Sequence, residues 1–154
     1  ALLAKLVTDS SLVPVLIGGP EDRELCLNAR DVFSGRTYIS AGDLSVQGSA
    51  ELINRADLLV TGDTAPLHLA QSVGTPTLAI FGPTVPEFGF APTGDNDRIV
   101  GLKLECRPCA IHGSDKCPLE HHDCMRSLGA ERVFAIIEEM LSESASQAQT
   151  SLPD

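Results

Sequence analysis

The 154-residue chain contains no tryptophan, and aromatic residues make up only 4% of it. It also lacks a long hydrophobic run, since its apolar stretches are only a few residues long and a bilayer span needs roughly 18. We therefore expect no transmembrane helix. Basic residues are scarce as well: 11 Lys and Arg stand against 21 Asp and Glu, a net charge of −10. A nucleic-acid partner needs a positive face, so we expect none.

The chain does contain enough apolar sequence, 43%, for a folded core. Its length suits one domain, which we expect to cover residues 1–141. Residues 142–154 are small and polar, and we expect them to be a flexible tail. The chain starts without methionine or a secretion signal, so we interpret it as a fragment of a longer protein. Its five cysteines, an odd number, do not suit an extracellular disulfide framework, so we expect a cytoplasmic protein.

Short β-rich runs alternate with helical patterns along the chain. The expected strands are 13–17, 37–39, 58–60 and 76–81. The expected helices are 1–7, 21–33, 45–56, 65–73 and 131–141. Apolar runs without alternation are typical of strands that are covered on both faces, as in parallel sheets. The pattern predicts an α/β fold with a doubly wound, Rossmann-like parallel sheet, in which ligands bind beyond the carboxyl ends of the strands.

The strongest candidate site is the turn between the third expected strand and the helix that follows it. Gly62 lets the chain turn closely, and Asp63 or Thr64 is expected to cap the helix. The first N–H groups of a helix, at the positive end of its dipole, can hold a phosphate. His68 lies on the first turn and can donate to a phosphate oxygen. The alternative is that Asp63 and Thr64 are only caps and His68 is an ordinary surface histidine.

The start of the first expected helix is acidic. Glu21 and Asp22 would repel a phosphate there, but carboxylates can accept hydrogen bonds from the vicinal hydroxyls of a ribose. The alternative is that they only stabilise the helix N-terminus. The chain has no Gly-x-Gly-x-x-Gly motif at this turn, which leaves a nicotinamide or flavin site without support.

Four of the five cysteines and three of the four histidines lie in one excursion, residues 104–125. They are Cys106, Cys109, Cys117, Cys124, His112, His121 and His122. Thiolates at this density can form a tetrahedral zinc site, although only one Cys-x2-Cys pair is present. Structural zinc, disulfides formed on isolation and free thiols remain open alternatives, and we expect the role of the segment to be structural. Cys26, on the apolar stripe of a helix, is expected to be a buried small hydrophobe.

The stretch from Gly62 to Pro86 contains Asp-Thr-Ala-Pro-Leu-His-Leu-Ala, followed by Gly-Thr-Pro-Thr-Leu-Ala-Ile-Phe-Gly-Pro-Thr-Val-Pro. It resembles the C-terminal nucleotide-sugar domain of the ADP-heptose:lipopolysaccharide heptosyltransferases, glycosyltransferase family nine. Ala65 stands where that family more often has glycine, and Gln71 replaces a usual alanine. The resemblance extends over about residues 10–141.

The resemblance implies a two-domain GT-B glycosyltransferase, with this chain as its C-terminal, donor-binding half. The implied activity is inverting transfer of heptose from ADP-heptose to the lipopolysaccharide inner core, without a required cofactor. The acceptor, lipid A or the inner core, would bind through a preceding N-terminal domain. The enzyme would be cytoplasmic, with peripheral association at the inner face of the inner membrane.

Six residues match the donor-binding positions of the family: Asp22, Leu44, Asp63, Thr64, Ala65 and His68. By the resemblance, Asp22 would take the ribose hydroxyls, Leu44 would face the adenine, and His68 would approach the phosphate or heptose. The other three would hold the diphosphate and sugar. The general base is expected in the N-terminal domain, so no catalytic residue is assigned here and the chain alone is expected to be inactive.

Two other functions remain open. A GT-B-like sugar-nucleotide epimerase would need a second acidic or histidine group near the anomeric centre, and His68 is the only histidine outside the cysteine segment. A non-catalytic interaction module organised by zinc would use that segment instead. Zinc content, measured together with nucleotide binding, separates this last reading from the two enzymes.

Overall fold

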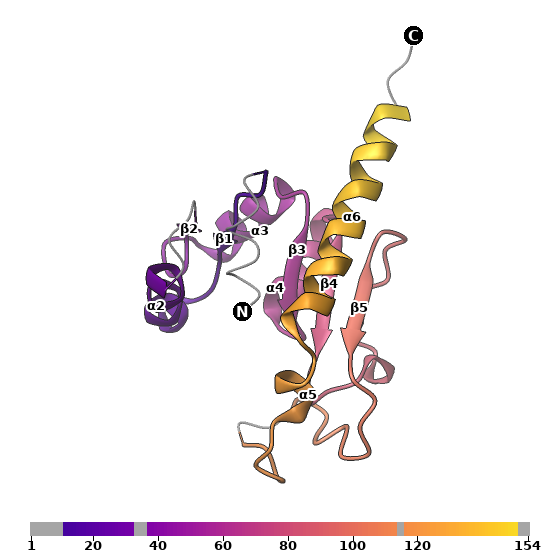
Figure 1. The fold of residues 1–154 in the computed structure, drawn as a ribbon. Helices are drawn as coiled ribbons and strands as arrows, with labels where there is room; N and C mark the ends of the chain where they lie inside the picture. Colours follow the sequence, from indigo (N-terminus) through magenta and orange to yellow (C-terminus); the bar gives the residue numbers. More distant parts are fainter. Residues whose placement is uncertain (1–10, 33–36, 114–115, 151–154) are drawn as a thin grey trace. The chain divides into compact units, whose positions relative to one another are not determined.

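The strands of the computed structural model form two parallel sheets (Figure 1). The structure describes residues 11–32, 37–113 and 116–150, so the helix expected over residues 1–7 lies outside these ranges. Backbone contacts divide the chain into two units, residues 1–49 and 50–154. The alternation of helices with parallel strands confirms the expected α/β class. The expectation of one domain over residues 1–141 stays a prediction.

The first unit runs from a strand through a turn and a helix to a second strand. β1 (Val15–Leu16) is followed by a single 3-10 turn, η1 (Pro20–Asp22), with proline at its first position. The helix α2 (Arg23–Val32) continues from it, and β2 (Tyr38–Ile39) then pairs with β1 in parallel. This is the expected order, with shorter strands, while Phe33 lies outside the described residues.

The loop after β2 packs against the start of η1. Gly42 has a φ of +78°, and a Cβ there would lie 3.0 Å from Pro20 Cα, so both the backbone angle and the close approach favour glycine. Arg23 holds the same loop, because its Nη1 donates to the Ala41 carbonyl and to the Asp43 carboxylate, each at 2.7 Å. The loop is therefore fixed to the turn that precedes α2.

The second unit contains a three-stranded sheet in the order β3 (Leu59–Gly62), β4 (Thr77–Phe81) and β5 (Arg98–Gly101). The helix α4 (Ala65–Val73) connects β3 to β4, and both pairings in the sheet are parallel. The helix α3 (Val46–Asn54) spans the division between the two units. All three arrows in the sheet point towards the same edge in Figure 1.

The helix α4 begins and ends where the sequence predicts. Gly74 ends it, with a φ of +77° and its N–H bonded to the Ala70 carbonyl. Leu67 on α4 packs with Ala79 and Phe81 of β4 in a buried cluster. Burial of these side chains holds α4 against the sheet, because removing apolar surface from water stabilises the packed arrangement by roughly 25 cal/mol per Å².

β5 was not predicted from the sequence. Its four residues follow a long loop that is rich in glycine and proline, and no element was expected there. Ile99 is exposed and Val100 is buried, so this edge strand carries only a short apolar signal. The strand is fixed instead by its pairing with β4, in which Ala79 lies opposite Ile99 and Ile80 lies opposite Val100.

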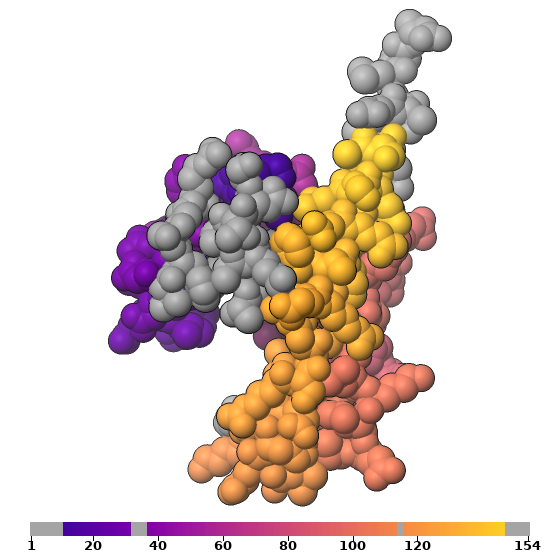
Figure 2. Space-filling model, viewed as in Figure 1, coloured from indigo at the N-terminus to yellow at the C-terminus, as the bar shows by residue number. Residues whose placement is uncertain are grey.

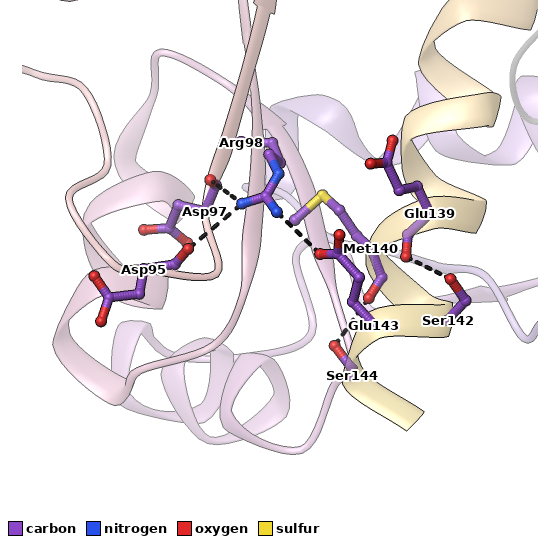
Figure 3. Close-up of polar contacts among 8 residues, drawn as sticks. All are labelled: Asp95, Asp97, Arg98, Glu139, Met140, Ser142, Glu143 and Ser144. Atoms are coloured by element: carbon purple, nitrogen blue, oxygen red, sulfur yellow. Dashed lines mark hydrogen bonds and ion pairs between the residues drawn. The ribbon is translucent and has the colours of Figure 1, made fainter. Parts of the chain in front are cut away.

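Figure 3 shows the polar contact between β5 and the helix α6 (Ala130–Thr150). Arg98 Nη2 donates to Glu143 Oε2 at 2.9 Å, and Arg98 Nη1 donates to the Asp97 carbonyl at 3.1 Å. Both partners of the ion pair are more than one third exposed, so its contribution to stability is small. The buried side chains Val133, Ile137 and Met140, spaced four and three residues apart, form the apolar face of α6.

The last helix is longer than the sequence suggests. It was expected to end at Leu141, but α6 continues to Thr150. Flexibility of residues 142–154 stays a prediction, and residues 151–154 lie outside the described part of the chain. Within the ranges that the structure describes, no helix combines the length and the apolar character needed to cross a membrane.

A carboxylate organises the turn that leads into β5. Asp97 accepts hydrogen bonds from the backbone N–H of Thr77 at 2.9 Å and of Gly94 at 2.8 Å, and from the Gln71 side chain at 2.9 Å. Thr77 is fully buried at the start of β4, so its N–H depends on this acceptor. Asp97 thus ties α4, β4 and the loop before β5 together.

We predict that Asp97→Ala lowers the free energy of unfolding by about 2 kcal/mol, because a buried N–H loses its acceptor. Urea unfolding of the 154-residue chain measures the change. Asp95→Ala, at an exposed position in the same turn, is the control and should leave the unfolding midpoint within error. Equal unfolding midpoints for Asp97→Ala and the parent chain would contradict the role given to Asp97.

Candidate functional site

The turn between β3 and α4 is built as a helix N-terminus at a strand end. Thr64 is the N-cap residue, with extended backbone angles, and its carbonyl accepts the N–H of Leu67 at 3.0 Å. The expected side-chain cap is not formed by Thr64, because its hydroxyl lies 3.2 Å from that of Thr61 and makes no cap hydrogen bond. Thr61, Asp63 and Thr64 therefore present polar side chains around the start of α4.

A second turn follows β4 at the same edge of the sheet. Parallel pairing places Thr61 opposite Ala79 and Gly62 opposite Ile80, so the chain leaves both strands at neighbouring points. The second turn, residues 82–84, contains the buried Thr84. The sequence-predicted positions Asp63, Thr64, Ala65 and His68 thus follow β3 at the same edge of the sheet where residues 82–84 follow β4. Ligands of parallel α/β sheets bind at this edge.

An aromatic residue that was not predicted to belong to the site, Phe90, lies next to His68. The His68 ring makes an edge contact with Phe90, with centroids 6.4 Å apart and planes at 74°. Phe90 also contacts His112, at 6.1 Å and 44°. His68 and His112 are exposed, so both imidazoles are accessible to a ligand. The sequence does contain a signal for Phe90 as a site residue, because it is an aromatic residue in a Gly- and Pro-rich loop of a chain that has few aromatic residues.

In the first unit, the structure places Asp22 and Leu44 on two segments that contact each other. Asp22 Oδ2 accepts the N–H of Gly19 at 2.9 Å, while the N–H of Gly42, two residues before Leu44, donates to the Gly18 carbonyl at 3.1 Å. Asp22 and Leu44 are both exposed. Both can therefore meet a ligand from solvent, although the Asp22 carboxylate already has a local partner.

The cysteine segment is attached to the end of β4. The Arg107 guanidinium donates to the carbonyl oxygens of Phe81 at 2.9 Å and Thr84 at 2.5 Å, and to that of Leu102. The Cys109 N–H donates to the Pro83 carbonyl at 2.9 Å. In Figure 2 much of this segment, drawn in orange, is open to solvent on the face in view. Its last residues form the short helix α5 (Asp123–Arg126), which the sequence did not predict.

The thiols of this segment lie in one electrostatic neighbourhood. Burial raises the pKa of Cys109, and the charges of Cys106, Cys117 and Cys124 raise it further, whereas Arg107 lowers it. All five cysteines of the chain are free in the structure. Among the described residues, no three His, Cys, Asp or Glu side chains already stand in the arrangement of a metal site. The three alternatives for the segment therefore remain.

Backbone N–H groups surround one of these thiols. Hydrogen bonds from the backbone, that of His122 first, lower the pKa of Cys117, and burial acts in the opposite direction. The other donors are Leu119, His121 and Glu120. The loop after Cys117 is thus folded to stabilise a negative sulfur.

The sheet defines a parallel α/β protein in which a helix begins directly after the carboxyl end of a strand. The chain belongs to glycosyltransferase family 9. The model of that family, described as "Glycosyltransferase family 9 (heptosyltransferase)", matches residues 1–119. This confirms the family resemblance that the motif from Gly62 to Pro86 indicates.

Curated relatives include two lipooligosaccharide heptosyltransferases 2 from Campylobacter jejuni. The protein of serotype O:2 is 38% identical over 88 residues, which is 57% of this chain and 27% of the relative. That of serotype O:6 is 28% identical over 91% of this chain and 44% of the relative. The lipopolysaccharide heptosyltransferase 1 of Pseudomonas aeruginosa is 32% identical over 64% and 30%. The chain thus spans less than half the length of these relatives.

Two solved structures share the fold. The E. coli ADP-heptose lipopolysaccharide heptosyltransferase II matches with a TM-score of 0.76 at 22% identity, over 93% of this chain and 40% of that one. The family 9 glycosyl transferase from Veillonella parvula matches with a TM-score of 0.74 at 22% identity, over 92% and 41%. At this identity the likeness concerns the fold, and it agrees with the GT-B type expected from the sequence.

We predict that Phe90→Ala shifts the imidazole resonances of His68 and His112 in the NMR spectrum of the chain. Both rings lie close to the Phe90 ring, so they lose its ring-current shift together. The signal of His122, which caps α5, serves as the internal control and should not move. A spectrum in which neither His68 nor His112 shifts would contradict the three-ring cluster.

Proposed function

We propose that the chain is the donor-binding domain of an inverting glycosyltransferase that transfers heptose from ADP-heptose to the lipopolysaccharide inner core. The observation that carries this proposal is the β3–α4 turn of a family 9 chain, set beside residues 82–84 by the parallel pairing of β3 with β4. The relatives are a lipooligosaccharide heptosyltransferase and a lipopolysaccharide heptosyltransferase, which agrees with this proposal.

In the second unit, the start of α4 would hold the donor diphosphate. Asp63, Thr64 and Ala65 surround the first turn, where the positive end of the helix dipole favours an anion. His68 is exposed three residues after Ala65 and would donate to a phosphate or heptose oxygen. Stabilising the negative charge of the departing ADP is the contribution that such a site can make to transfer.

In the first unit, Asp22 would accept hydrogen bonds from the ribose hydroxyls, and Leu44 would face the adenine. Leu44 is 42% exposed, which leaves apolar surface for a planar base to cover. The hydrogen bond between Gly42 and Gly18 keeps their two segments together within this unit. Recognition of the nucleoside would therefore use side chains from these two hydrogen-bonded segments.

The general base and the acceptor site are assigned to a preceding N-terminal domain, so none of these 154 residues is proposed to be catalytic. Lipid A or inner-core acceptor would reach the site through that domain, in a cytoplasmic enzyme at the inner face of the inner membrane. The transfer needs no metal in this proposal, and structural zinc in the cysteine segment would be independent of it.

One observation bears on the epimerase alternative. His112 belongs to the cysteine segment in sequence, yet it contacts the same Phe90 ring as His68. The chain thus has a second imidazole in this neighbourhood, which sequence alone did not show. Incubation of an ADP-sugar with the chain, followed by NMR of the sugar protons, distinguishes the glycosyltransferase from the epimerase. An epimer of the sugar would form only if the chain were an epimerase.

We predict that His68→Ala weakens ADP binding about tenfold, the cost of one hydrogen bond to a charged group. Thr64→Val, which keeps the shape of the side chain and removes its hydroxyl, should weaken it in the same direction. Adenosine, which has no phosphate, should bind equally to the parent chain and both variants. Titration calorimetry measures the affinity of each of the three proteins for ADP and for adenosine.

The matched control is Ser72→Ala, at an exposed position on the last turn of α4. It should bind ADP as the parent does. Unchanged ADP affinity in both His68→Ala and Thr64→Val would show that the diphosphate does not bind at the β3–α4 turn.

We predict that Asp22→Asn weakens ADP and adenosine to the same extent, several-fold each, because the carboxylate would meet the ribose and not the phosphates. Asparagine keeps an oxygen for the Gly19 N–H, so the local fold is retained. The variant should also lose the preference of the parent for adenosine over 2′-deoxyadenosine. Glu24→Gln, an exposed change on α2, is the control. A variant that keeps the full preference would exclude Asp22 as the ribose acceptor.

A further inference from the structure

The Phe90 ring joins two histidines from segments that are far apart in the chain. It contacts the His68 ring, with centroids 6.4 Å apart, and the His112 ring, with centroids 6.1 Å apart. His68 lies on α4, whereas His112 belongs to the cysteine segment. Both imidazoles therefore lie against one aromatic ring, within reach of one extended ligand.

The turn that carries His112 packs on the loop that follows β4. The Gly113 N–H donates to the Ala110 carbonyl at 3.2 Å, which closes a turn around His112. A Cβ placed on Gly113 would lie 3.2 Å from Pro83 Cγ and 3.7 Å from Thr84 Cγ2. The chain thus comes close to the loop after β4 at the residue next to His112.

Two hydrogen bonds fix the same segment a few residues earlier. The Cys109 N–H donates to the Pro83 carbonyl at 2.9 Å. The Arg107 guanidinium donates to the Phe81 carbonyl, also at 2.9 Å. His112 is therefore held at the carboxyl edge of the sheet, the edge from which α4 also starts. Parallel α/β sheets bind their ligands at this edge.

Both imidazoles are available to a ligand. His68 and His112 are exposed, and among the residues that the structure describes neither ring donates or accepts a hydrogen bond. The imidazole of His121 differs, since its Nδ1 accepts the N–H of Asp123 at 2.9 Å. A neutral imidazole has one N–H donor, so His68 and His112 can each donate to a bound group.

A phosphate is the group that needs such donors here. Its oxygens accept hydrogen bonds, and the first turn of α4 supplies few backbone donors to them. Pro66 has no N–H, and the Leu67 N–H already bonds to the Thr64 carbonyl at 3.0 Å. Arg107, a cation at this edge, is committed to backbone carbonyls. Side-chain donors from other segments must therefore complete a phosphate site at this turn.

We propose that His112 is a second imidazole that donates to the diphosphate of the nucleotide sugar, and that Phe90 is the positioning residue that holds both imidazoles towards it. This inference rests on the proposed function, because it adds residues to the same donor site. The cysteine segment then takes part in donor binding, beyond the structural role expected from the sequence. The charge of the departing ADP is stabilised by one imidazole from each of two segments.

The first experiment measures the affinity of His112→Ala for ADP and for adenosine by titration calorimetry. ADP binding should weaken about tenfold, the effect of one lost hydrogen bond to a charged group, and adenosine binding should not change. His112→Gln, which restores an N–H donor, should recover part of the loss. Ile111→Ala, at an exposed neighbouring position, is the matched control and should bind ADP as the parent does.

A double-mutant cycle tests the positioning role of Phe90. Phe90→Leu keeps an apolar side chain but removes the ring, and it should weaken ADP binding several-fold without changing adenosine binding. In this background His112→Ala should reduce ADP affinity by a smaller factor than in the parent, because the imidazole is no longer held towards the ligand. An equal factor in both backgrounds would show that Phe90 does not position His112.

Each of three results would overturn the role of His112. If His112→Ala binds ADP as the parent does while His68→Ala binds it more weakly, this inference fails and the proposed donor site stands. Equal weakening of ADP and adenosine binding by His112→Ala would show that this imidazole acts through the fold of the segment and not on the phosphates. If none of the His68, Thr64 and His112 variants changes ADP affinity, the proposed diphosphate site fails together with this inference.

Discussion

Parallel pairing of β3, β4 and β5 is the constraint on which the second unit depends. In a parallel ladder every strand runs the same way, so every strand delivers its following loop to the same edge. The register that sets Gly62 opposite Ile80, and Phe81 opposite Gly101, therefore brings three loops together. Phe90 lies next to His68 for this reason, although no local pattern connects the two residues.

Arg107 connects that edge to the cysteine segment. Carbonyl groups beyond the end of a strand have lost their ladder partners and need other donors. The guanidinium supplies several N–H groups in a rigid plane, and it bonds the carbonyls of Phe81, Thr84 and Leu102. A lysine has the same charge but not this geometry.

Sequence reasoning succeeded where the signal is local and failed where it is not. The helix α4 was predicted from its first residue to its last, because Pro66 near its start and Gly74 after its end mark both termini. β5 was missed, since the burial of Val100 comes from pairing with β4 and the preceding loop masks a four-residue strand. Asp63 or Thr64 was expected to cap α4, and Thr64 is the N-cap residue, but its hydroxyl faces that of Thr61 and makes no cap hydrogen bond. That choice depends on side-chain rotamers.

The sequence by itself determined the α/β class, the order of the main elements, the family and the residues at the β3–α4 turn. Turn chemistry and hydrophobic periodicity are properties of neighbouring residues, so they can be read along the chain. Only the tertiary structure decided that the Phe90 ring contacts both His68 and His112, and that the Cys109 N–H bonds to the Pro83 carbonyl. Those contacts join residues far apart in the chain, and they arise because parallel strands end at one edge, which no local pattern encodes.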